Sequence, residues 1–196
     1  MRLHYNAPLI LNFSLICVIL TSINQISNDS FTSLISLPAS YNISNPIHII
    51  NLITYTFGHG SFSHLLGNLT FILLLGPALE EKHGRKNLLF MMIVTTIVTG
   101  LLNILFFSSG LMGASGIVFL LIMLNSFTGF KENHIPLSFI LVALLFLGKE
   151  VINAFETDRI SQFAHIAGGI TGSYFGYILN ERKSKSMSED LPGAPS

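Results

Sequence analysis

The chain has 196 residues, of which 50% are hydrophobic and only 10% are charged, and its formal net charge is zero. A soluble domain carries roughly 25% charged residues, so this composition excludes an ordinary soluble protein and indicates an integral membrane protein. The balanced charge gives no footprint for nucleic acid, and the single cysteine, Cys17, excludes a disulfide framework and a cysteine-based zinc site.

The first predicted element is a membrane span from Pro8 to about Ile26. No small-residue cleavage site follows it clearly, so we predict an anchored helix and not a signal peptide. Residues 28–48 are predicted to form a loop on the membrane interface, because apolar side chains are scattered among its polar ones. Five further spans are predicted: Leu69–Leu79, Leu88–Phe107, Ser115 to about Phe130, Ile135–Ala154 and Ser161–Leu179. A charged turn, residues 80–86, is expected between the second and third of the six spans.

The basic residues predict the orientation of these six spans. Eight of them fall on one side: Arg2, Lys82, Arg85, Lys86, Lys131, Arg182, Lys183 and Lys185. Only Arg159 falls in a loop on the other side, with Lys149 near it. The positive-inside rule then predicts that both termini are cytoplasmic. The membrane itself is expected to be the plasma (inner) membrane of a bacterium. We expect a membrane domain over residues 1–180 and a polar, disordered cytoplasmic tail over residues 181–196.

The stretch from Tyr55 to Asn68, YTFGHGSFSHLLGN, is unusual for the entry of a membrane helix. His64 and Asn68 are four residues apart and share one helix face. A metal site would need a third ligand, and no carboxylate stands at a suitable spacing. A lone buried asparagine is often a contact between helices. Near a serine nucleophile, however, the two side chains fit the donors of an oxyanion hole.

The stretch from Leu111 to Gly116, LMGASG, precedes an apolar run and places Ser115 at the start of a helix. Backbone amides at a helix N-terminus favour negative charge, which suits a nucleophile whose product is an oxyanion. A packing site of small residues between two membrane helices is the alternative interpretation. From this stretch alone, packing is the simpler of the two.

The sixth predicted span contains the sequence AHIAGGITG, residues 164–172. An ionisable residue such as His165 inside a span is a functional hypothesis by default, although it could also bond a neighbouring helix. Gly168 and Gly172 are four residues apart and would allow another helix to approach this face closely, which could bring His165 to Ser115.

Depth in the membrane can be compared by counting residues. Ser115, His165 and His64 each precede a cytoplasmic charge, at Lys131, Glu181 and Glu80, by 16 residues. At about 1.5 Å per residue, each group stands roughly 24 Å above those charges, in a hydrocarbon core about 30 Å thick. We therefore expect the three groups to share one level near the outer surface.

These features together resemble the rhomboid family of intramembrane serine proteases. The matching residues are Gly113-Ala114-Ser115-Gly116, the His64-to-Asn68 entry of the second span, Ala164-His165 with Gly168 and Gly172, and the segment from Gly76 to Gly84 with Glu80. The resemblance covers roughly residues 51–179 and implies an all-α bundle of six transmembrane helices of rhomboid type.

The resemblance also implies roles for individual residues. Ser115 would be the nucleophile and His165 the general base of a Ser-His dyad. His64, Asn68 and the Ser115 backbone amide would form the oxyanion hole. Support would come from residues around the dyad: Gly113, Gly116, Phe119, Gly168 and Gly172. The expected partners are transmembrane protein substrates in the lipid bilayer, cut near the outer end of their span, and no metal, cofactor or nucleic acid is implied.

Two departures from the family pattern concern rate and specificity. Many members carry a Trp-Arg pair in the first loop, and this chain has no tryptophan. Phe119 stands one turn after Ser115, where members often place a tyrosine, so it can stack on the histidine but cannot donate a hydrogen bond.

Two other functions stay open. A non-catalytic relative that binds membrane helices is opposed by the intact Ser115 and His165, and a small transporter is opposed by the lack of inverted repeats and of membrane carboxylates.

Overall fold

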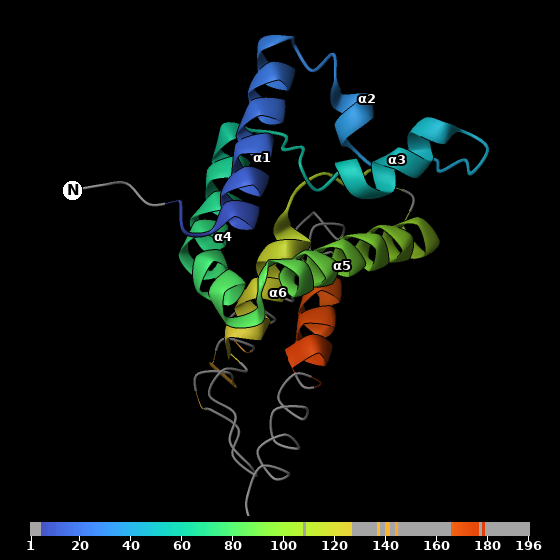
Figure 1. The fold of residues 1–196 in the computed structure, drawn as a ribbon. Helices are drawn as coiled ribbons and strands as arrows, with labels where there is room; N and C mark the ends of the chain where they lie inside the picture. The colour runs from blue at the N-terminus through green and yellow to red at the C-terminus, as the bar shows by residue number, and fades with distance from the viewer. Residues whose placement is uncertain are drawn as a thin grey trace, which may run out of the picture.

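The structure is a computed structural model that describes residues 5–107, 109–126, 137, 140, 141, 144, 166–176 and 178. Its helices are α1 (Pro8–Ile26), α2 (Thr32–Ile35), α3 (Pro46–Thr54), α4 (Phe62–His83), α5 (Arg85–Phe106) and α6 (Ser115–Ser126). Residues 166–176 form a further helical segment. In Figure 1, α1 and α4 run side by side, whereas α5 leaves them at a wide angle.

Three of these helices, α1, α4 and α5, are long and apolar enough to cross a membrane. They confirm the first three predicted spans and an all-α membrane protein, since the described residues form no strand beyond the isolated bridge of Leu37 with Leu111. α6 begins at the predicted Ser115. The predicted end of the fourth span near Phe130, most of the fifth span, the start of the sixth span and the tail from residue 181 lie outside the described residues, so the count of six stays a prediction.

The prediction of a charged turn over residues 80–86 is wrong, because all of these residues except Gly84 are helical. Gly84 has a φ of 77° and serves both as the C-cap of α4 and as the N-cap of α5. A left-handed conformation of this kind costs glycine nothing, so the chain changes direction within a single residue. Lys82 and His83 in the last turn of α4 suit the negative end of its dipole.

α6 is the central helix of the described structure. Seven of its twelve residues are buried, namely Ile117, Val118, Phe119, Leu120, Leu121, Ile122 and Leu124. A helix that is apolar on all sides is expected to be enclosed on all sides. The main hydrophobic core accordingly joins α6 to α1, α4 and α5, and includes Ile10, Ile72 and Leu88, all fully buried. This core holds the start of α6, with Ser115, in a fixed place.

The buried carboxylate of Glu80 joins α4 to the beginning of α1. Its two oxygens accept hydrogen bonds from the backbone N–H groups of Leu9 at 3.1 Å and Ile10 at 3.0 Å. The Nε of Arg85 lies 3.4 Å from Oε1 of Glu80. A carboxylate at this position satisfies amides of the first turn of α1 and complements the positive end of its dipole.

Replacing Glu80 by alanine should therefore destabilise the protein by about 2–4 kcal/mol, because one buried and one partly buried N–H group lose a charged acceptor. Thermal unfolding in detergent would measure the loss. Glu81→Ala is the matched control, since the adjacent carboxylate of Glu81 is exposed. Equal melting temperatures for the two variants would show that the cap contributes no stability.

The first loop is more ordered than predicted, because α2 and the beginning of α3 fall within residues 28–48. The buried side chain of Asn24 holds the start of this loop against α1. It accepts a hydrogen bond from the N–H of Phe31 at 3.0 Å and donates one to the hydroxyl of Thr32 at 3.1 Å. Asn45 caps α3, and Pro46 starts it. α3 exposes Ile47, Ile49 and Ile50, a pattern that agrees with the predicted position on the membrane interface.

Candidate active site

The loop before Ser115 is fastened from three directions. Leu111 and Leu37 exchange backbone hydrogen bonds of 2.8 and 3.0 Å, and the N–H of Gly113 donates to the carbonyl of Tyr55 at 2.9 Å. The side-chain amide of Asn103 on α5 donates to the carbonyl of Ser109 at 2.9 Å. The first loop and α5 together therefore set where the chain enters α6.

Gly113 meets the two polar residues of α4. A Cβ built on Gly113 would lie 2.8 Å from Cε1 of His64 and 3.8 Å from Nδ2 of Asn68. The φ of Gly113 is 136°, a backbone conformation that residues other than glycine rarely adopt. Both this conformation and the closeness of His64 therefore favour glycine here. The structure thus brings His64 and Asn68 together at the loop, two residues before Ser115.

Asn68 holds a buried donor toward this loop. Its side chain is 8% exposed, and within the described part of the chain Nδ2 has no hydrogen-bond partner. Buried amide groups normally have a partner, so such a donor suits an incoming acceptor. The side chain of His64 is exposed, while its backbone N–H is capped by the Ser61 hydroxyl at 3.1 Å. Ser115 is half-buried at the N-terminus of α6.

His59 is a further residue of this region that the sequence analysis left without a role. It is fully buried, and its ring meets the ring of His64 edge-on, with centroids 5.1 Å apart. Its Nδ1 lies 3.5 Å from the hydroxyl of Thr21 on α1. The signal was present in the stretch HGSFSH, but the five-residue spacing does not place both rings on one helix face. Only the turn before α4 brings them into contact.

Burial, with a smaller effect of the neighbouring His64 charge, lowers the pKa of His59 to about 4. The folded protein therefore holds neutral His59, whereas the unfolded chain takes up a proton below about pH 6.5. The free energy of unfolding therefore keeps its full value above about pH 6.5, and the contribution of His59 is lost as the pH falls toward 4.

Acidification from pH 7 to pH 5 should accordingly cost about 2 kcal/mol of unfolding free energy through His59. The measurement is denaturant unfolding at both pH values, for wild type and for His59→Gln. The variant should lose that much less stability on acidification than wild type. An identical pH dependence in the two proteins would contradict the assignment.

The helical segment 166–176 packs closely on α6 through its glycines. A Cβ on Gly168 would overlap the backbone carbonyl of Gly116, and one on Gly172 would lie 2.9 Å from the carbonyl oxygen of Leu120. The two contacts advance by the same four residues on both helices, so the helices run in the same direction. The close approach of another helix that the sequence predicts at Gly168 and Gly172 is therefore present, with Gly116 and Leu120 of α6 as the neighbours.

Phe119 lies on the same interface, buried at 5% exposure, and a Cβ on Gly169 would lie 3.9 Å from its ring. His165 falls outside the described residues, so its predicted pairing with Ser115 stays a prediction. The roles predicted for Ser115, His64 and Asn68 likewise stay predictions.

Comparison with known proteins agrees with this arrangement. The Rhomboid domain family model matches residues 46–182, more than half of the chain. Rhomboid-related protein 1 of Caenorhabditis elegans is 34% identical over 139 residues, which cover 64% of this chain but only 38% of that relative. Rhomboid-like protein 11, chloroplastic, of Arabidopsis thaliana is 23% identical over 89% of this chain and 68% of its own length. Rhomboid protease GlpG of Haemophilus influenzae is 27% identical over 69% of this chain and 72% of its own length. On the extent of the family match, the chain belongs to the rhomboid family.

Proposed function

We propose that this chain is an intramembrane serine protease that hydrolyses peptide bonds in or near the outer end of substrate transmembrane helices. The observation that carries the proposal is the contact of Gly113 with His64 and Asn68, which brings two polar donors of α4 to the loop that leads into Ser115. Relatives whose names include "rhomboid protease" support a hydrolase.

In the proposed mechanism, His165 takes the proton of the Ser115 hydroxyl, and Ser115 Oγ attacks the substrate carbonyl. The resulting oxyanion is held by the Ser115 amide and by the side chains of His64 and Asn68. His165 then donates its proton to the leaving amine, and water hydrolyses the acyl-enzyme. Hydrolysis of this kind uses only groups of the chain and water.

The register of the segment 166–176 supports the proposed dyad. Gly168 lies on Gly116, and Ser115 is the residue before Gly116. His165 precedes Gly168 by three residues, which is about one helical turn. A helix that continued unbroken to residue 165 would therefore reach the level at which Gly113 leads into α6 at Ser115. Phe119 lies on the same face of α6, one turn below Ser115.

The remaining parts of the proposal concern the membrane. Both termini are cytoplasmic in a six-span bundle in the plasma membrane of a bacterium, and the cut lies near the outer end of single-span substrates. A substrate helix must unwind before its carbonyls can be attacked, and glycine lowers that cost by up to about 1 kcal/mol relative to alanine. Glycine near the cut therefore favours cleavage.

A fluorophosphonate probe tests the proposal directly, because it reacts with an activated serine. Wild-type protein in detergent should be labelled and should cleave a single-span substrate, whereas Ser115→Ala should do neither. Ser126→Ala, which removes another hydroxyl of α6, should keep both activities. Binding of the substrate helix without labelling or cleavage by wild type would favour a non-catalytic rhomboid-like protein.

The oxyanion hole makes a separate prediction for Asn68. Asn68→Ala should lower the turnover number by roughly ten- to a thousandfold, the range for loss of one donor, and should leave KM nearly unchanged. Steady-state cleavage kinetics would measure both, and Asn87→Ala on α5 is a control for an exposed amide. If Asn68→Ala mainly unfolded the protein in detergent, Asn68 would be a packing residue.

A further inference from the structure

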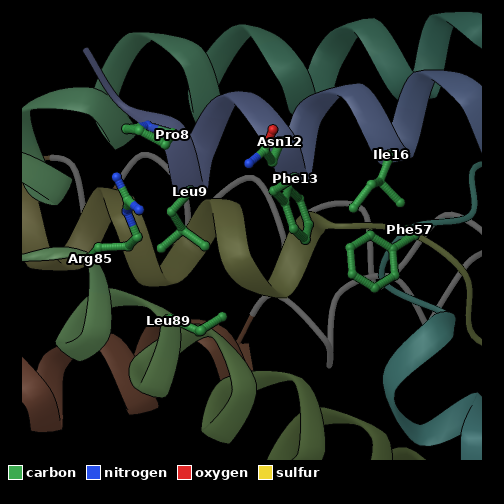
Figure 2. A pocket seen from close by; sticks show the side chains of 8 residues that line it. All are labelled: Pro8, Leu9, Asn12, Phe13, Ile16, Phe57, Arg85 and Leu89. Carbon is green, nitrogen blue, oxygen red and sulfur yellow. The ribbon is translucent and has the colours of Figure 1, made fainter. Parts of the chain in front are cut away.

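An apolar groove lies between α1 and the beginning of α5. It has a volume of about 260 Å³ and is lined by Pro8, Leu9, Asn12, Phe13, Ile16, Phe57, Arg85 and Leu89. Figure 2 shows Arg85 beside Pro8 and Leu9 at one end of the groove, and Phe57 beside Ile16 at the other. The groove opens because α5 turns away from α1 soon after Gly84 (Figure 1).

The position of the groove in the membrane follows from its helices. Arg85 is the first residue of a membrane-spanning helix, so it stands at the membrane–water boundary. Eight residues of α1 separate Pro8 from Ile16, so the groove extends roughly 12 Å toward the middle of the bilayer. Its far end is closed by the rings of Phe13 and Phe57, with centroids 5.0 Å apart. A groove of this shape suits one hydrocarbon chain that lies along α1.

Arg85 supplies a cation at the open end of the groove. Its side chain is 61% exposed, and within the described residues its ion pair with Glu80 uses only Nε. The two Nη groups of a guanidinium add four further N–H donors in a planar arrangement that matches phosphate. A phosphate at the membrane surface is therefore the chemical group that this end of the groove favours.

Asn12 gives a second, independent indication of a lipid. It is exposed on the wall of the groove, one turn deeper than Pro8. Its Oδ1 accepts a hydrogen bond from the hydroxyl of Tyr5 at 2.6 Å, which leaves the two Nδ2 donors for an acceptor near the membrane surface, where water is scarce and unpaired polar groups are costly. A phospholipid presents ester carbonyls about this far below its phosphate.

We propose that the groove binds one acyl chain of an anionic phospholipid whose phosphate is held by Arg85 and whose ester carbonyl accepts from Asn12. The bound chain covers Phe13, Phe57 and Leu89. Phe57 is two residues before His59, so an occupied groove also supports the turn that precedes α4.

The experiment measures thermal unfolding of the full chain in phosphatidylcholine bicelles, with and without added phosphatidylglycerol. Wild type should melt at a higher temperature with phosphatidylglycerol. Arg85→Gln should weaken the apparent affinity for this lipid about fivefold or more, and Leu89→Phe, which fills the groove, should abolish the shift. Lys86→Gln and Ile93→Phe are matched controls and should keep it. Leu89 and Ile93 are 42% and 40% exposed, one turn apart on α5, but only Leu89 lines the groove.

Each variant is compared with its own melting temperature without phosphatidylglycerol, because Arg85→Gln also loses its contact with Glu80. If Arg85→Gln does not fold, Leu89→Phe against Ile93→Phe decides the question. The proposal is overturned if wild type shows no shift, if glycerol phosphate alone gives the same shift, or if the shift survives in Leu89→Phe. A shift that depends on Arg85 but not on Leu89 indicates surface charge attraction without an acyl-chain site.

Discussion

Ser115→Ala and His165→Ala should each lower the turnover of a single-span substrate by about 10⁴- to 10⁶-fold, the range for removal of a nucleophile or its base from a serine hydrolase. The two losses should not add in the double variant, because the residues act as one unit. Quantified cleavage of a purified substrate in proteoliposomes would give the rates. Melting temperatures within a few degrees of wild type would show that the loss is chemical.

The comparison of the single variants also tests the pairing. If His165→Ala kept most of the wild-type rate while Ser115→Ala lost it, another group would have to accept the serine proton. Retained cleavage in Ser115→Ala would remove the nucleophile assignment altogether, and with it the proposed mechanism.

Gly168→Ala should be strongly damaging, although Gly168 lies outside the proposed catalytic groups. Its new methyl would overlap the backbone carbonyl of Gly116, which cannot rotate away as a side chain can. The segment 166–176 and α6 would have to separate, at a cost of about 1–3 kcal/mol for overpacking. Because Gly116 adjoins Ser115, a displacement of about 1 Å should also lower activity by about 100-fold.

Gly169→Ala is the matched control, since it adds the same methyl on the next residue of the same segment. That methyl would lie 3.9 Å from Phe119 and 4.0 Å from Met123, which is ordinary van der Waals contact. Thermal unfolding and turnover of the two variants should therefore differ strongly. Similar values for both would mean that the close approach at Gly168 has no functional importance.

The membrane class, the first three spans and the start of α6 could be predicted from the sequence alone. Composition and hydropathy determine which segments enter lipid, because an apolar run long enough to span the bilayer is most stable as a helix in the hydrocarbon core. The starts of α1 and α6 were predicted at Pro8 and Ser115, as the structure has them. Glycines four residues apart, Gly168 and Gly172, likewise indicated a close contact between helices before any partner was known.

Other features depended on tertiary structure. Nothing local in the sequence joins Glu80 to the amides of Leu9 and Ile10, which are 70 or more residues away. The contact of His59 with His64 depends on the turn before α4, and the five-residue spacing of the two histidines does not predict the geometry of that turn. The groove at Arg85 lies where α5 leaves α4 after Gly84 and diverges from α1. Periodicity fixes which face of a helix is apolar, but the relative placement of helices is decided by packing between residues distant in the chain.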